Sequence, residues 1–128
     1  MRNNLLMKFT LEERQAVTVR HVERGLLKIG TESVTENVVL FRNRIRPGWD
    51  AATVEALTEA DFADLMAERP EIVILGTGWQ PALPPRELVF AMARRGIGFE
   101  TMDTPAACRT FNILLSEDRD AAAILLLR

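Results

Sequence analysis

Cysteine and histidine are nearly absent from this sequence, which holds one of each, Cys108 and His21, among 128 residues. A single cysteine cannot form an internal disulfide, and two such side chains fall short of the four ligands of a usual zinc site. We therefore expect no disulfide and no metal site, and the sequence offers no motif for a cofactor. The lack of disulfides fits a reducing, cytoplasmic setting.

The sequence also lacks an excess of basic charge and long apolar runs. The 16 basic residues are outnumbered by 18 acidic ones, and no local run supplies the dense basic face on which nucleic-acid binding rests. The longest apolar run, 121–127, is far shorter than the ~20 residues of a membrane-spanning helix. Between Met1 and Thr10, Lys8 interrupts the apolar residues before the core of a signal peptide is complete. Nucleic-acid partners, transmembrane segments and a secretion signal are thus not expected.

The length and the apolar share of 48% are those of one globular domain, which we expect to span residues 1–128. Short, branched apolar stretches between residues 15 and 41 predict antiparallel strands joined by tight turns. Residues 46–49, Arg-Pro-Gly-Trp, have the composition of a turn. Thr58, with Asp61 three residues later, predicts the start of a capped helix.

The second half of the sequence alternates predicted strands and helices. Strands are expected over 72–75, 97–102 and 121–127, and helices over 85–95 and 104–116. This order predicts crossover units of a parallel or mixed sheet, and strands that are apolar throughout are normally covered on both faces. The predicted fold class is therefore α/β, with antiparallel N-terminal strands and a βαβαβ C-terminal half.

One candidate site follows the first of these strands directly, at Gly76-Thr77-Gly78. A glycine pair at a strand end lets the backbone turn sharply and present its N–H groups to an anion. The third glycine and the immediate helix of a dinucleotide site are missing, as is the lysine of a nucleoside-triphosphate loop. A plain strand-to-loop turn at the carboxyl edge of the sheet is the alternative that this weak match favours.

A second candidate site begins at Asp103. Thr104 has the character of a helix N-cap, with Pro105 at the first helical position, so free N–H groups are expected to point back toward the strand end. Arg109 is suited to clamp a carboxylate or phosphate, although pairing with Asp103 or with loop carbonyls is the more common role. Because parallel strands end at one edge of a sheet, this helix start and the 76–78 loop are predicted to wall one shallow pocket.

Four further side chains have a functional and a structural interpretation. Cys108, near a helix start and beside Arg109, is either an acidic thiol or a small core residue, and the second is favoured. Asn112 either contacts a substrate or satisfies polar groups in the interior. The functional interpretation of Trp79 is that it covers the pocket or anchors a partner, and the structural one is that it packs on the sheet edge. Trp49 is a second candidate for partner contact.

Several stretches, taken in order, resemble a known family. They are Gly76-Thr77-Gly78, Arg95-Gly96-Ile97-Gly98, Met102-Asp103-Thr104 and the run from Ala107 to Asn112, closed by an apolar strand. The chain resembles the archaeal, bacterial and mitochondrial family of unknown function that includes a respiratory complex I assembly factor. The resemblance implies a three-layer single domain with a mixed central sheet, a surface cleft near the glycine loop and no established enzymatic activity. Carried over, the signature positions are Gly76, Thr77, Gly78, Asp103, Thr104, Cys108, Arg109 and Asn112.

This chain departs from the family at Phe111, where members often have tyrosine, so no phenolic role carries over. Two functions are carried forward. The first is a non-enzymatic binding protein, similar to the assembly factor, that engages a respiratory subunit or another factor through a patch around Trp49 or Trp79. The second is a small-anion or metabolite site, with or without catalysis, between the 76–78 loop and the helix at Thr104. A homo-oligomer is left open by the sequence, and the absence of an Arg- and Ser-rich leader predicts a prokaryotic source.

Overall fold

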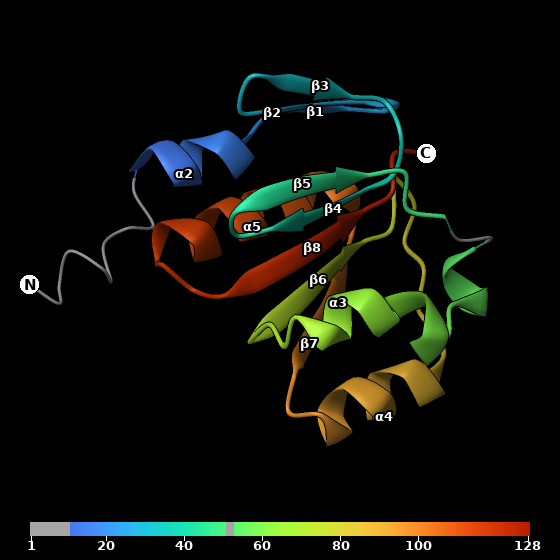
Figure 1. Ribbon diagram of the computed structural model, residues 1–128. Helices are drawn as coiled ribbons and strands as arrows, with labels where there is room; N and C mark the ends of the chain where they lie inside the picture. Colours follow the sequence, from blue (N-terminus) through green and yellow to red (C-terminus); the bar gives the residue numbers. More distant parts are fainter. Residues whose placement is uncertain (1–10, 51–52) are drawn as a thin grey trace, which may run out of the picture.

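The computed structural model describes residues 11–50 and 53–128 (Figure 1), so the prediction for Met1 to Thr10 lies outside the described residues. The strands are β1 Val19–Glu23, β2 Leu26–Ile29, β3 Glu32–Val34, β4 Val38–Phe41, β5 Arg44–Pro47, β6 Ile72–Gly76, β7 Gly98–Met102 and β8 Ala121–Leu125. The helices are α2 Leu11–Val17, α3 Ala63–Ala67, α4 Arg86–Arg94 and α5 Thr104–Ser116, with short 3-10 turns η1 Val54–Ala56 and η2 Glu59–Phe62.

Five strands form the central sheet, in the order β5-β4-β8-β6-β7. Strand β6 pairs in parallel with both β7 and β8, whereas β4 pairs antiparallel with β8 and with β5. The chain order β6-α4-β7-α5-β8 is the predicted βαβαβ unit, so the α/β fold class with a mixed central sheet is confirmed. The carboxyl ends of β6, β7 and β8 consequently lie at one edge of the sheet, where ligand sites of such folds are usually found.

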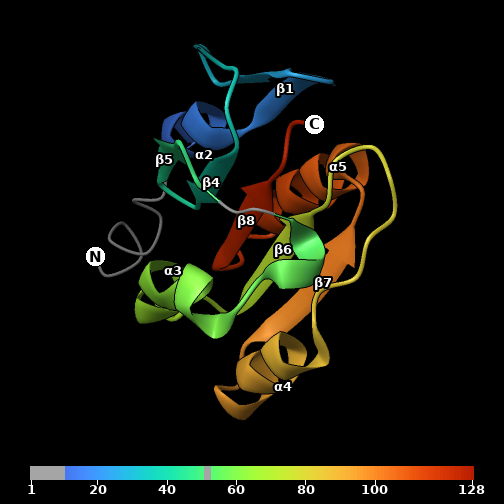
Figure 2. The ribbon, with the colours of Figure 1, turned by 90° about the vertical axis from the view of Figure 1, so that its right-hand side faces the viewer.

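Alternate residues of the central strands face opposite layers, because side chains of a strand point in turn to its two faces. Ile74 belongs to the core that α5 and the N-terminal strands cover, together with the fully buried Phe111. Val73 and Leu75 belong to the core beneath α3 and α4, together with the fully buried Phe62. Figure 2 shows α5 on one side of the sheet and α3 with α4 on the other. The three-layer arrangement and the two-sided cover of the apolar strands are thus confirmed.

The N-terminal strands divide between two sheets. Strands β1, β2 and β3 form a separate antiparallel sheet, which lies above the central one in Figure 1, while β4 and β5 join the central sheet. The residues of β4 are buried throughout, whereas in β1 only Val19 is buried. The predicted antiparallel pairing is confirmed, and the division follows from this difference, since only β4 is apolar enough to be covered on both faces.

Two local predictions in this half were wrong. Residues 15–17, expected in a strand, complete helix α2, and Val17 is buried from that helix. The Thr18 hydroxyl ends the helix by donating to the Arg14 carbonyl oxygen at 2.6 Å. Arg46 and Pro47, expected in a turn, end strand β5, and residues 48–50 follow as an irregular segment. Proline is tolerated there because β5 lies at the edge of the sheet.

The predicted helices are confirmed with small changes at their starts. The Thr58 amide donates to Asp61 Oδ2 at 2.8 Å as expected of a capping box, and the segment begins as the 3-10 turn η2 before it becomes α3. Pro85 is the cap residue of α4 and not its first helical residue. Helix α5 has the predicted bounds. None of the helices in the described part of the chain is both long and apolar enough to cross a membrane.

Candidate functional site

The glycine loop and the start of α5 meet at the carboxyl edge of the central sheet, as the sequence predicted. Gly76 is the register partner of Met102 in the parallel pair β6 and β7. Two hydrogen bonds of 2.8 Å then join the loop to the helix: the Thr104 amide donates to the Gly78 carbonyl oxygen, and the Gly78 amide donates to Thr104 Oγ1. These bonds place the two segments in direct contact.

Thr104 is not the N-cap of α5, which corrects the sequence prediction. Asp103 is the cap residue, because its backbone is extended and its Oδ1 accepts a hydrogen bond of 2.8 Å from the Ala106 amide. Thr104 is the first helical residue and is fully buried. Its hydroxyl donates to the Leu126 carbonyl oxygen at 2.6 Å while it accepts from Gly78. We call this pair of bonds the Thr104 bridge.

Positions 76 and 78 require glycine because other segments of the same chain approach them closely. Gly78 has a φ of +91°, and a Cβ there would overlap the carbonyl oxygen of Arg128. A Cβ on Gly76 would lie 3.0 Å from Ala107 Cβ and from Thr104 Oγ1. The space beside the glycine loop is therefore filled by α5 and by the segment that follows β8.

The amide groups of the glycine loop, which the sequence suggested for anion binding, donate hydrogen bonds to other residues of the chain. The Thr77 amide donates to the Met102 carbonyl oxygen at 2.9 Å, and the Gly78 amide is part of the Thr104 bridge. Arg109 is exposed and forms no ion pair or hydrogen bond with the residues that the structure describes. A ligand held by residues 76–78 and Arg109 stays a prediction, and its binding requires the loop bonds to open.

Cys108 is buried in the core, and the Asn112 side chain is hydrogen-bonded to the backbone of β1. Burial raises the pKa of the Cys108 thiol to about 12, against a smaller opposite effect of the Arg109 charge, so the thiol is protonated at neutral pH. The Asn112 side chain accepts from the Val19 amide at 3.0 Å and donates to the Val19 carbonyl oxygen at 2.9 Å. It thereby replaces a neighbouring strand for β1 and fixes the small sheet to α5.

The two tryptophans proposed for partner contact are each half-buried. The Trp49 ring packs edge-to-face on Phe62, with 5.7 Å between ring centroids. The Arg24 guanidinium lies 5.6 Å from the centroid of the Trp79 ring, within cation–π range. Partner contact through either ring stays a prediction.

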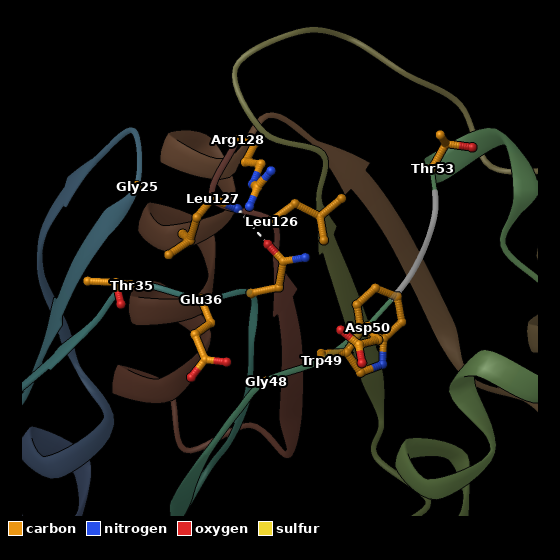
Figure 3. Close-up of a pocket in the computed structure, with 11 residues that line it drawn as sticks. Gly25, Thr35, Glu36, Gly48, Trp49, Asp50, Thr53, Leu126, Leu127 and Arg128 are labelled. Carbon is orange, nitrogen blue, oxygen red and sulfur yellow. Dashed lines mark hydrogen bonds between the residues drawn. The ribbon is translucent and has the colours of Figure 1, made fainter.

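A cavity of about 680 Å³ lies at the same edge of the sheet and is drawn in Figure 3. Its walls are the segments 35–37, 48–50 and 126–128, with Gly25 and Thr53 at its margin. We call it the Trp49 cavity. Figure 3 shows Trp49 and Asp50 on one side, Glu36 on another and Arg128 at the far end from Glu36.

The glycine loop builds one wall of the Trp49 cavity indirectly. The Leu126 amide donates to the Gly76 carbonyl oxygen at 3.0 Å, and the Leu126 carbonyl oxygen accepts from Thr104. The Leu127 amide donates to Asn37 Oδ1 at 3.0 Å. The segment after β8 is therefore held in place from two sides, and the residues that the sequence singled out for ligand binding position the backbone that lines this cavity.

Sequence reasoning missed Glu36, Asn37 and Asp50 at this cavity. The signal was weak, since each is a single polar residue beside a short strand. Asn37 reaches the end of β8 because β4 runs antiparallel to β8, with Val38 opposite Leu125. That register is a property of the assembled sheet. In the described part of the chain no three His, Cys, Asp or Glu side chains are grouped to hold a metal ion.

Comparison with known proteins agrees with this architecture. The profile of the family described as "Protein of unknown function (DUF498/DUF598)" matches residues 19–126. The chain belongs to this family. Within the DUF498/DUF598 family, the match extends from β1 to the residue after β8, so it includes the glycine loop, α5 and most walls of the Trp49 cavity.

Three relatives with descriptive names are similar to this chain. The human protein named NADH dehydrogenase [ubiquinone] 1 alpha subcomplex assembly factor 3 is 30% identical over 93% of this chain and 67% of its own length. A Francisella tularensis protein named 13 kDa major membrane protein is 30% identical over 57% of this chain and 59% of its own length. The bovine assembly factor is 38% identical, but this chain spans only 44% of it. The chain thus corresponds to part of each of these relatives.

Solved structures of related proteins have the same fold. The solution structure of a Xanthomonas campestris protein superposes with a TM-score of 0.78 at 28% identity, over 85% of this chain and 83% of that one. The crystal structure of an outer membrane protein from Bartonella henselae gives a TM-score of 0.76 at 28% identity, over 89% of this chain and 97% of that one. The fold described above is therefore shared by these two bacterial proteins.

Proposed function

We propose that this chain is a binding protein without catalytic activity, located in the cytoplasm, that acts in the assembly of a respiratory complex. It does so by engaging a subunit or another assembly factor. The observation that carries the proposal is the similarity to the human assembly factor, which extends over 93% of this chain. The similar part makes up 67% of the length of that protein.

The chemistry of the candidate side chains supports a binding role. A nucleophilic cysteine acts as a thiolate, whereas the pKa of Cys108 is raised to about 12 by burial. An oxyanion or phosphate site needs free amide donors, whereas the Thr77 and Gly78 amides bond to Met102 and Thr104. The buried Cys108 side chain and the two bonded amide groups therefore contribute to the stability of the fold.

Exposed apolar side chains on α4 and on the loop that precedes it offer a surface for a protein partner. Leu83, in the loop that precedes α4, is 78% exposed, and Phe90 on α4 is 54% exposed. Helix α4 packs its opposite face, including Met92, into the core. Arg86 and Arg94 lie one turn before and after Phe90 and so flank it. An aromatic and an aliphatic anchor with arginines beside them are typical of protein interfaces.

Affinity purification with quantitative mass spectrometry from native cells tests the proposal. We expect the wild-type chain to recover subunits or assembly factors of a respiratory complex, and Leu83→Ser combined with Phe90→Ser to lose them. Ile113→Ser is the matched control, because Ile113 is 56% exposed on α5, on the other side of the central sheet. Failure of the wild-type chain to recover such proteins contradicts the assembly role. If the double variant recovers the same proteins in full, only the assignment of the binding surface to Leu83 and Phe90 is contradicted.

A further inference from the structure

The Trp49 cavity carries negative charge that the described residues leave uncompensated. The carboxylates of Glu36 and Asp50 line it, both residues are exposed, and neither has a hydrogen-bond or ion-pair partner in ranges 11–50 and 53–128. Arg128 is the one cationic side chain of the lining. Figure 3 shows it at the far end of the cavity from Glu36, so it does not neutralise that carboxylate.

The chain that continues from the cavity is acidic as well. Residues 50–68 contain six aspartates and glutamates and no lysine or arginine. Three of these carboxylates are paired at 2.7–2.9 Å with arginines from other segments: Glu59 with Arg95, Asp64 with Arg46 and Glu68 with Arg44. The fold thus neutralises the far part of the segment and leaves Asp50 at the cavity without such a partner.

The remaining groups of the lining suit an organic cation. An indole attracts ammonium and guanidinium groups through its ring, and the Trp49 indole lines the cavity on the same side as Asp50 in Figure 3. Asn37 uses its oxygen to hold the Leu127 amide, which fixes its side chain at the cavity wall. The volume of about 680 Å³ falls in the range of small-molecule sites. A metal ion is less well served, because no three ligand side chains are grouped among the described residues.

From these observations we propose that the Trp49 cavity binds an organic cation, a guanidinium or primary ammonium group, through the carboxylates of Glu36 and Asp50 beside the Trp49 ring. The group comes either from a free small amine or from an arginine or lysine side chain of a protein. The proposal does not depend on the assembly role, because it follows from the charge and shape of the cavity alone.

The test is a titration followed by two-dimensional nitrogen–proton NMR, with butylguanidinium as the probe and butylurea as its uncharged counterpart. The indole N–H signal of Trp49 reports on the cavity, and that of Trp79, outside the lining, is an internal control. We expect butylguanidinium to shift the Trp49 signal with a saturable curve and a Kd on the order of 1 mM. Butylurea should bind at least roughly tenfold more weakly, because it lacks the charge.

Variants assign the binding to the two carboxylates. Glu36→Gln combined with Asp50→Asn should weaken butylguanidinium binding by roughly tenfold, while the fold is kept because neither side chain has a partner to lose. Glu55→Gln is the matched control, an exposed acidic residue of the same segment outside the lining, and should change the Kd by less than about twofold.

Three results would overturn the proposal: equal binding of butylurea, equal binding by the double variant and the control, or no saturation up to about 50 mM probe. A capped peptide, acetyl-Gly-Arg-Gly-amide, identifies the source. Binding of the peptide at least roughly tenfold tighter than butylguanidinium supports a protein side chain as the natural occupant. Equal or weaker binding of the peptide supports a free small amine.

Discussion

Replacing Thr104 by valine isolates the energetic contribution of the Thr104 bridge. Valine has nearly the shape and helix propensity of threonine, so the substitution removes the hydroxyl and little else. Two backbone groups then lose their partner, the amide of the buried Gly78 and the carbonyl oxygen of the half-buried Leu126. A buried polar group left without a hydrogen bond costs about 1–3 kcal/mol.

The expected loss is the sum of a middle and a lower value from that range. The Gly78 amide is in a buried bond and should cost about 2 kcal/mol, whereas water reaches the Leu126 oxygen more easily, which lowers its cost to about 1 kcal/mol. Thr104→Val should therefore reduce the free energy of unfolding by roughly 3 kcal/mol. With a urea m-value of about 2 kcal/mol per molar, the unfolding midpoint should fall by roughly 1.5 M.

Urea unfolding followed by far-UV circular dichroism measures this shift, and two variants control it. Thr104→Ser keeps the hydroxyl and removes one buried methyl, so it should cost only about 1 kcal/mol. Thr110→Val, on the same helix, removes only a 3.3 Å bond to the Met102 sulfur and should cost less than about 0.5 kcal/mol. The reasoning is refuted if Thr104→Val unfolds with the wild-type midpoint, or if serine costs as much as valine.

Three further predictions follow from the same region. Gly78→Ala should destabilise the fold by at least about 2 kcal/mol more than Gly96→Ala in urea unfolding, because both glycines have positive φ but only at Gly78 does a Cβ overlap backbone. Cys108 should not react with a thiol reagent at pH 8 until urea unfolds the chain. Since its pKa is raised to about 12, the contribution of this thiol to stability should be constant below the unfolded pKa of about 8.5 and fall as the pH rises toward 12. Asn112→Asp should lower the melting temperature more at pH 7 than at pH 4, because only a protonated carboxyl can donate to the Val19 carbonyl oxygen. If the substitution lowers the melting temperature by the same amount at pH 7 and at pH 4, this account of Asn112 is contradicted.

Much of the second half of the fold was predictable because its signals are local. The bounds of α5 follow from Pro105 near its start and from the apolar stripe behind it, and these act within a few residues of the chain. The glycines at 76 and 78 marked a sharp change of direction after a strand, which the structure confirms. The parallel order of β6 and β7 then placed Gly76 and Met102 at one edge, as expected of crossover connections.

The N-terminal half was less predictable, since short strands and helices of mixed composition depend on what covers them. The run from Ala16 to Val22 predicts an alternating strand, yet Val17 is buried equally well from helix α2, which the structure forms up to that residue. Nothing local separates β3 from β4, which join different sheets.

By itself, the sequence determined the α/β class, the position of most elements of the second half and the meeting of the glycine loop with α5. Tertiary structure alone decided what those residues do there: the Thr104 hydroxyl and the glycine amides bond to neighbouring chain. It also decided where an open cavity lies, because the residues that line the Trp49 cavity are up to 103 positions apart in the sequence, from Gly25 to Arg128. The physical reason is that helix starts and turns depend on neighbouring residues, whereas the partner of a buried hydroxyl or carboxylate depends on which strands lie side by side.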